Sequence, residues 1–206
     1  MKRALIFGGG IYGGEFPVIS PDDLIIAADK GAEILIAHGI APNITVGDFD
    51  SSSVIPEKDV IRLPVEKDVT DTHAAVEIAL VRGCDEIHIY GGMGGRVDHT
   101  FANYSLLSSL SEKGIRAYLF GEGYRITALF NGKITLSGKI GETLSVFSWS
   151  EESKGVTLRG VKYPLENSVL HKNFALGVSN SFSEEKAEIS VEDGILLIMQ
   201  EISVDK

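Results

Sequence analysis

Up to Phe120, short apolar runs alternate with stretches whose apolar residues recur at helical spacing. Strands separated by helices pair in parallel, and the helices then cover both faces of the sheet. The sequence therefore predicts an α/β domain with a mostly parallel sheet flanked by helices. The predicted strands are residues 3–7, 24–28, 44–46, 60–63, 86–90 and 116–120, and the predicted helices are residues 30–39, 70–82 and 99–112.

The pattern changes at Gly121–Gly123. From Tyr124 onward the chain has short runs of alternating polarity and no helical stretch, which is typical of antiparallel sheets. Asn131-Gly132 and Asp193-Gly194 each separate two such runs, and these dipeptides predict tight hairpin turns. We therefore expect two domains, an α/β domain over residues 1–122 and an antiparallel, β-sandwich-like domain over residues 123–206.

Composition argues against several classes of protein. The chain carries 19 Lys and Arg against 29 Asp and Glu, a formal net charge of −10, whereas nucleic-acid binders rely on cations. The apolar run after Arg3 is too short for a signal peptide, and no run is long enough to cross a bilayer. Because Cys84 is the only cysteine, no intrachain disulfide is possible. We expect a cytoplasmic protein without nucleic-acid or membrane partners.

Two aspartates one residue apart, Asp48 and Asp50, follow the third predicted strand. Their like charges repel unless a cation lies between them, and Mg²⁺ is the leading candidate for carboxylate oxygens. The alternative is an Asx-type turn with solvated carboxylates. The metal interpretation gains weight because Asp29, Gly8–Gly14 and Gly91–Gly95 also follow predicted strands, and the carboxyl ends of parallel strands meet at one ligand-binding edge.

Residues 66–72 are dense in polar groups just before a predicted helix. Asp71 is the best third metal ligand in the chain, and the ammonium group of Lys67 suits a phosphate oxygen. The alternative is helix capping by Thr70 or Asp71, which would satisfy backbone amides at the helix start.

A second polar stretch, residues 91–99, reads Gly-Gly-Met-Gly-Gly-Arg-Val-Asp-His. Its glycines let backbone amides approach a phosphate, and the helix that follows attracts an anion at its start. The guanidinium of Arg96 matches phosphoryl oxygens. For Asp98 the alternative is N-capping of the helix. We expect His99 to be a surface residue and Asn103 a polar residue of that helix.

The first glycine cluster, Gly8–Gly14, spells the G-x-G-x-x-G fingerprint of dinucleotide-binding domains, and Asp29 ends the next strand. Such a domain needs a helix between the two strands. The segment from Glu15 to Asp23 is short for that purpose and contains two prolines, which oppose a helix. A hydride-transfer enzyme is therefore a minor alternative.

Six motifs in this order resemble the thiamine pyrophosphokinase family, and the resemblance spans nearly the whole chain. They are Ala28–Ala32, Gly47–Ser51, Asp68–Asp71, Gly91–His99, Gly160–Leu165 and Gly177–Asn180. Enzymes of this family transfer a diphosphate group from ATP to the hydroxyl of thiamine, giving thiamine diphosphate and AMP. The resemblance implies the same activity here, in a homodimer that binds thiamine between one subunit's α/β domain and the other's β domain.

The resemblance also implies roles for single residues. Asp48, Asp50 and Asp71 would hold Mg²⁺. ATP would bind to the residues Asp48, Asp50, Lys67, Thr70, Gly91, Gly92, Gly94, Gly95 and Arg96. Catalysis would involve Asp71, Asp98 and Arg96, and the sequence does not choose between Asp71 and Asp98 as acceptor of the hydroxyl proton. Thiamine would bind to Asp29, Asp98, Tyr163, Ser179 and Asn180; some family members have Trp in place of Tyr163.

Two other functions stay open on the residues alone. One is a phosphatase in which Asp48 is the covalent nucleophile. Two features argue against a phosphatase: the Asp-x-Asp pair follows the third strand and not the first, and a glycine-rich loop precedes Arg96. The other is a nucleotide-binding sensor without catalytic activity, whose β domain recruits a partner.

Overall fold

The computed structural model describes residues 2–12, 16–47, 60–62 and 69–202. Three predicted site residues, Asp48, Asp50 and Lys67, lie outside the described residues. The chain divides into two compact units. The first comprises Met1–Leu106 and Ile115–Glu122, and the second comprises Leu107–Gly114 and Gly123–Lys206.

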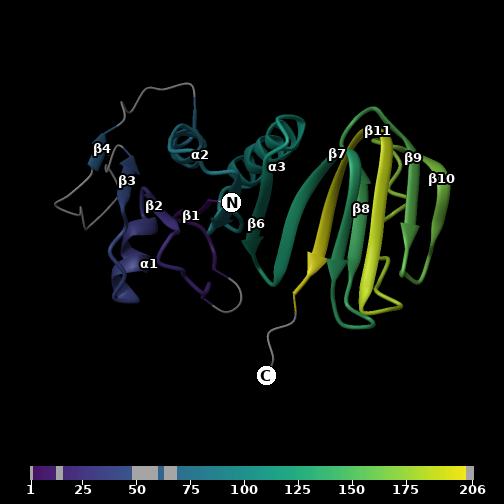
Figure 1. Cartoon of the computed structure of the whole chain (residues 1–206), viewed down its shortest axis with the longest axis horizontal. Coiled ribbons are helices and arrows are strands. Elements are labelled where there is room, and N and C mark those ends of the chain that lie inside the picture. The colour runs from purple at the N-terminus through teal and green to yellow at the C-terminus, as the bar shows by residue number, and fades with distance from the viewer. Residues whose placement is uncertain (1, 13–15, 48–59, 63–68, 203–206) are drawn as a thin grey trace. The chain divides into compact units, whose positions relative to one another are not determined.

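The first unit contains a parallel sheet with the strand order β6-β5-β1-β2-β3-β4 (Figure 1). Each of its pairings is parallel. The strands are β1 (Arg3–Phe7), β2 (Leu24–Ala28), β3 (Ile44–Gly47), β4 (Val60–Arg62), β5 (Glu86–Tyr90) and β6 (Arg116–Gly121). The chain builds outward from β1 to β4, then returns to add β5 on the other side of β1. This reversal creates a switch point between β1 and β5, where open α/β sheets bind ligands.

Helices cover both faces of this sheet, as Figure 1 shows for α1 (Gly31–Ala37) and α2 (Asp71–Val81). Leu5 and Phe7 of β1 share a core cluster with Leu35 of α1. Alternate strand residues point to the opposite face, where α2 contacts β1, β2, β3 and β5. The predicted α/β architecture is confirmed.

Helix α3 (Val97–Glu112) begins two residues before the predicted start at 99. Asp98 therefore lies inside the first turn instead of preceding the helix, and its Oδ1 accepts a hydrogen bond from its neighbour His99 N at 3.0 Å. The alternative interpretation of Asp98 as the N-cap is wrong.

The second unit is antiparallel. Its long strand β11 (Lys186–Glu201) pairs with β7 (Tyr124–Ser137) along one side and with β9 (Glu152–Arg159) and β8 (Leu144–Ser148) along the other, and β10 (Leu165–His171) pairs with β9. The described residues from 124 to 202 contain no helix. Buried side chains of these strands form one core, which includes Val146, Val156, Leu158, Ile189 and Leu196. The fold-class prediction is thus confirmed for this half as well.

The two predicted hairpin turns are wrong. Asn131-Gly132 lies within β7 and Asp193-Gly194 lies within β11. The dipeptides face each other across the ladder, where the register shifts between Val191 and Ile195, and Asn131 Oδ1 accepts a hydrogen bond from Gly194 N at 2.8 Å. Their permissive backbones form a bulge instead of turns, close to where β11 changes its partner from β9 to β8.

No helix connects β1 to β2 in the described residues of that connection. Instead, the ring of Phe16 stacks on Phe7 of β1 with ring centroids 5.4 Å apart and on His38 with centroids 4.1 Å apart. A dinucleotide-binding domain requires a helix here, so the hydride-transfer alternative fails. Within the part of the chain that the structure describes, no helix is long and apolar enough to span a membrane.

Candidate functional site

Two glycine-containing loops meet at the switch point. Gly8 N donates to Tyr90 O at 2.8 Å, Gly10 N to Gly91 O at 2.8 Å, and Ile11 N to Met93 O at 2.9 Å. A Cβ on Gly10 would lie 2.5 Å from the carbonyl oxygens of both Gly91 and Met93, closer than such atoms can approach. Glycine is therefore required at position 10 for the two loops to pair.

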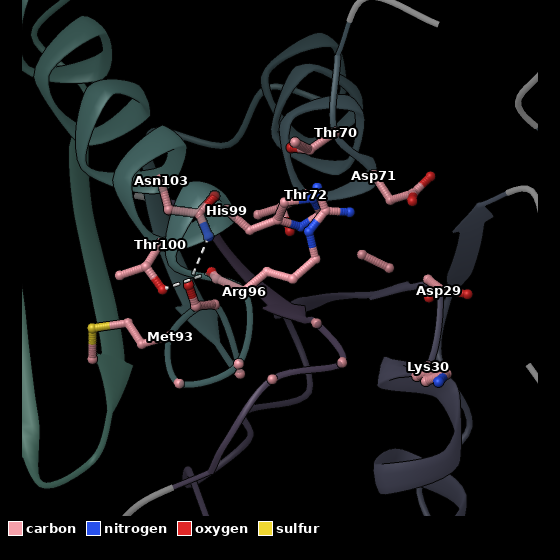
Figure 2. A pocket seen from close by; sticks show the side chains of 18 of the residues that line it. Asp29, Lys30, Thr70, Asp71, Thr72, Met93, Arg96, His99, Thr100 and Asn103 are labelled. Carbon is pink, nitrogen blue, oxygen red and sulfur yellow. Dashed lines mark hydrogen bonds between the residues drawn. The ribbon is translucent and has the colours of Figure 1, made fainter. Parts of the chain in front are cut away.

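A pocket of about 810 Å³ opens beside these loops. Figure 2 shows that its walls come from the end of β2, the start of α2, and the loop and first turns leading into α3. The sequence segments predicted to converge do so within the described residues. The lining residues are Gly8, Gly9, Gly10, Ala28, Asp29, Lys30, Val69, Thr70, Asp71, Thr72, Gly91, Gly92, Met93, Gly94, Gly95, Arg96, His99, Thr100 and Asn103.

Asp29 follows β2 at the pocket with a left-handed backbone, φ 50°. Few non-glycine residues adopt this conformation, and those that do cluster at functional sites. Asp29 N donates to Val46 O at 2.8 Å. A Cβ on Gly47 would lie 3.3 Å from the Asp29 Cα. The last described residue before Asp48 thus packs against a pocket residue.

Thr70 and Asp71 lie at the start of α2. Thr70 is the N-cap, because its Oγ1 accepts a hydrogen bond from His73 N at 3.2 Å. The capping interpretation is thus confirmed for Thr70 and is wrong for Asp71, which is the first residue of the helix. An acidic residue in a first turn is stabilised by the helix dipole, and this one also lines the pocket.

Arg96 and Asp98 form a two-point ion pair. Arg96 Nε donates to Asp98 Oδ1 at 3.1 Å, and Arg96 Nη2 donates to Oδ2 at 2.6 Å. This hydrogen bonding lowers the pKa of the Asp98 carboxyl and raises the pKa of the guanidinium. Arg96 lines the pocket, whereas Asp98 is not among the described lining residues. The two side chains are mostly exposed, so the pair orients Arg96 more than it stabilises the fold.

The predicted thiamine-binding residues Tyr163, Ser179 and Asn180 belong to the second unit. The Tyr163 side chain is exposed, and Lys162 Nζ lies 5.3 Å from its ring centroid. Ser179 has a left-handed backbone, φ 56°, and its N donates to Ser145 Oγ at 3.0 Å. Asn180 is buried, and its carboxamide hydrogen-bonds to both the N and the O of Tyr163. Asn180 therefore holds the loop that carries Tyr163.

The described residues contain no group of three or more His, Cys, Asp or Glu side chains able to hold a metal ion. Two of the three predicted metal ligands, Asp48 and Asp50, lie outside those residues. The surroundings fit a hard divalent cation, because the carboxylates of Asp29 and Asp71 line the pocket and supply oxygen donors. The chain leaves β3 at Gly47, beside one of them.

Sequence reasoning did not assign Lys30, Thr72, Met93 or Thr100 to the site, and all four line the pocket. Lys30 and Thr72 directly follow the predicted residues Asp29 and Asp71 in the sequence, and this adjacency is the sequence feature that could have indicated them. His99 is an exposed residue of the first turn, as predicted. Asn103, expected only as a polar helix residue, is buried, and its Nδ2 donates to Gly92 O at 2.8 Å.

A nucleotide-sized pocket at a switch point, lined by a glycine loop, an arginine and acidic side chains, is typical of enzymes that act on phosphate groups. Comparison with known proteins identifies the family. Residues 17–119 match the model of the thiamin pyrophosphokinase catalytic domain, and residues 133–196 match that of its vitamin B1 binding domain. A thiamine pyrophosphokinase of Bacillus subtilis (strain 168) is 31% identical over 188 residues, which is 86% of each chain.

Comparison with solved structures points to the same family. The crystal structure of thiamine pyrophosphokinase from Bacillus subtilis has a TM-score of 0.85 at 28% identity and covers 99% of this chain and 100% of its own. The enzyme from Geobacillus thermodenitrificans has a TM-score of 0.83 at 26% identity, with 98% of both chains covered. The chain belongs to the thiamin pyrophosphokinase family. It transfers a diphosphate group from ATP to thiamine, as the sequence predicts, and the family generally works with a divalent metal ion.

Proposed function

We propose that the pocket at the β1–β5 switch point binds the polyphosphate of ATP and is where the thiamine hydroxyl attacks. One observation carries the proposal: Asp71, Arg96 and the Gly91–Gly95 loop line the same pocket although they come from separate segments of the chain. Within it we assign ATP binding to Thr70, Gly91, Gly92, Gly94, Gly95 and Arg96, joined by Lys67, Asp48 and Asp50.

The proposed reaction is an in-line displacement at the β-phosphorus. A bond forms from the thiamine oxygen to this phosphorus while the bond to the bridging oxygen of the α-phosphate breaks, and AMP leaves with that oxygen. Such transfers demand little covalent chemistry from the protein, so positioning and charge neutralisation dominate. Arg96 and the loop amides neutralise phosphoryl charge. We propose that Asp48, Asp50 and Asp71 hold Mg²⁺, which when bound neutralises further phosphate charge.

Asp71 and Asp98 were the two candidates for accepting the hydroxyl proton. Asp98 is engaged by the guanidinium of Arg96, and of the two carboxylates only Asp71 lines the pocket. We therefore assign proton acceptance to Asp71. Asp98 in this proposal orients the guanidinium of Arg96.

For thiamine we propose Asp29 and Asp98 in the first unit and Tyr163, Ser179 and Asn180 in the second. Thiazolium is a cation with a flat ring, which suits a carboxylate and an exposed aromatic face.

We further propose that residues 1–122 form the ATP- and Mg²⁺-binding domain and that residues 123–206 bind thiamine and form a homodimer. Each thiamine would then lie between two subunits. A lone, buried Cys84 is in keeping with a reducing cytoplasm.

Asp71→Asn tests the assignment. With ATP, Mg²⁺ and thiamine, the unmodified enzyme should release AMP in step with thiamine diphosphate. We expect the variant to lose at least about a hundredfold in kcat, because it loses both a metal ligand and a base. Its melting temperature should stay close to that of the unmodified enzyme.

The matched control is Asp22→Asn, an exposed carboxylate of the same unit outside the pocket, which should keep full activity. Near-full activity in Asp71→Asn would show that the metal and base assignments are wrong. Release of ADP in place of AMP would instead contradict attack at the β-phosphorus.

A further inference from the structure

Every peptide carbonyl from Tyr90 to Gly94 accepts a hydrogen bond from a neighbouring part of the first unit. Backbone amides of the Gly8–Ile11 loop donate to the oxygens of Tyr90, Gly91 and Met93 at 2.8 to 2.9 Å, and Ile11 N also approaches Gly94 O at 3.2 Å. The remaining carbonyl, Gly92 O, accepts from Asn103 Nδ2 at 2.8 Å. Each acceptor that faces the interior is thus satisfied.

The amides of the same loop are in the opposite situation. The N–H groups of Gly92, Met93, Gly94 and Gly95 donate to no acceptor among the described residues. These residues line the pocket. A run of backbone N–H groups whose carbonyls are turned away forms a concave site for anions. The orientation of each peptide plane therefore decides whether the pocket presents donors or acceptors to a phosphate.

Asn103 donates to the one carbonyl of this run that accepts from no backbone amide among the described residues. Its side chain reaches the loop from α3 and is buried, with 4% of the residue exposed. Because a carbonyl oxygen can only accept, the Asn103 atom facing Gly92 O is the amide nitrogen. Figure 2 shows this bond from the helix to the loop. Because Gly92 has no Cβ, its backbone dihedral angles are less restricted than those of any other residue type.

We infer that Asn103 is a positioning residue for ATP, and that by holding the Gly92 carbonyl inward it keeps the loop amides aimed at the polyphosphate. This inference rests on the proposed function, since it takes the pocket to be the phosphate site. Without the bond, the Gly92–Met93 peptide is free to rotate and to turn an acceptor toward the anion. Asn103 itself need not touch ATP.

Two variants test the inference. Asn103→Leu keeps the size and removes the donor. Asn103→Asp keeps the shape and places a carboxylate against the Gly92 carbonyl. We expect Asn103→Leu to raise the KM for ATP by about tenfold, and to raise by the same factor the Kd for inorganic pyrophosphate, measured with Mg²⁺ by calorimetry. This factor corresponds to the loss of one hydrogen bond from a loop amide to a charged phosphate oxygen. Asn103→Asp should be worse. The KM for thiamine should change less than twofold in both.

Ser108→Ala is the matched control, because it removes a buried polar group from the same helix outside the pocket. If the role of Asn103 is purely structural, both Asn103 variants should lower the melting temperature, as we expect of the control, and leave ATP and pyrophosphate affinity unchanged. Affinities within twofold of the unmodified enzyme in both Asn103 variants would overturn the inference. Asn103→Asp, which keeps the shape of the side chain, provides the test if Asn103→Leu folds poorly.

Arg96→Ala separates this inference from the proposed function. If Arg96→Ala leaves the KM for ATP unchanged, the pocket does not hold the polyphosphate and the proposed function fails with the inference. If Arg96→Ala weakens ATP binding and both Asn103 variants do not, the proposed function stands and only the role of Asn103 is refuted.

Discussion

Asn180 offers a sharp test of how the second unit serves thiamine. The resemblance to the family implies that Asn180 contacts thiamine, yet its carboxamide is used inside the chain. Its Oδ1 accepts from Tyr163 N and Ser181 N, both at 2.9 Å, and its Nδ2 donates to Tyr163 O at 2.8 Å. The exposed member of this arrangement is Tyr163, with 58% of the residue exposed. We predict that Asn180 acts on thiamine through Tyr163.

The structure sets the expected magnitudes. Tyr163→Ala removes an aromatic face, and a cation–π contact is worth about 1–2 kcal/mol, so the KM for thiamine should rise roughly 5- to 30-fold. Asn180→Ala removes three hydrogen bonds of about 1 kcal/mol each, so the free energy of unfolding should fall by about 1–3 kcal/mol. Because Tyr163 then loses its support, the KM for thiamine should rise by a similar factor, and the KM for ATP should not change.

A double-mutant cycle gives the decisive measurement. If Asn180 acts only through Tyr163, adding Asn180→Ala to Tyr163→Ala should leave the KM for thiamine unchanged in an assay of AMP release. Asn131→Ala is the matched control, since it also removes a side-chain bond to a backbone amide in the second unit and should cost stability without changing that KM. If Asn180→Ala raises the KM equally with and without the Tyr163 ring, Asn180 contacts thiamine directly and the reasoning is refuted.

Two further predictions concern the first unit. Gly10→Ala should lower the free energy of unfolding, measured by urea denaturation, by about 2 kcal/mol or more, and it should reduce activity. The reason is that its Cβ would lie 2.5 Å from two carbonyl oxygens, so that the loop pairing would break. The control Gly132→Ala, whose Cβ would have its nearest contact at 3.4 Å, should leave the free energy of unfolding nearly unchanged. The hydrogen bond from Arg3 lowers the pKa of Asp23, so the pair stabilises the fold above the unfolded pKa of about 4 and loses this contribution as the pH falls through the folded value. Asp23→Asn should therefore cost about 1–3 kcal/mol at pH 7 and clearly less at pH 3, and an equal cost at both pH values would refute the assignment.

The fold of the first unit was predictable because buried parallel strands and amphipathic helices have different periods. Every strand predicted up to Phe120 is present, and Gly39 and Gly83 each lie just beyond the helix they were expected to end, with positive φ. The second unit was less predictable. A dipeptide such as Asn131-Gly132 reports only that the backbone is permissive, and whether it turns or bulges depends on a partner strand far away in sequence.

The site was predictable as a set of strand ends but not as a set of side-chain roles. Parallel topology brings Asp29, Asp71 and Arg96 together whatever lies between them. The roles that we propose for Asp98, Asn103 and Asn180 depend on which atom each side chain faces, and sequence spacing carries no such information. Each of the three hydrogen-bonds to a neighbouring residue of the proposed site, so each is a candidate for positioning another group.

The first glycine cluster shows why a motif alone cannot decide between chemistries. In a dinucleotide-binding domain these glycines admit a pyrophosphate and a crossover helix. Here Gly8 and Gly10 admit the carbonyls of the neighbouring loop, to which their amides donate. Those bonds engage the carbonyls of the second loop, whose amides have no acceptor among the described residues. In the proposed site, these glycines would therefore act on phosphate indirectly: the first cluster holds the carbonyls of the second loop, and the second loop, which lines the pocket, would bind the phosphate.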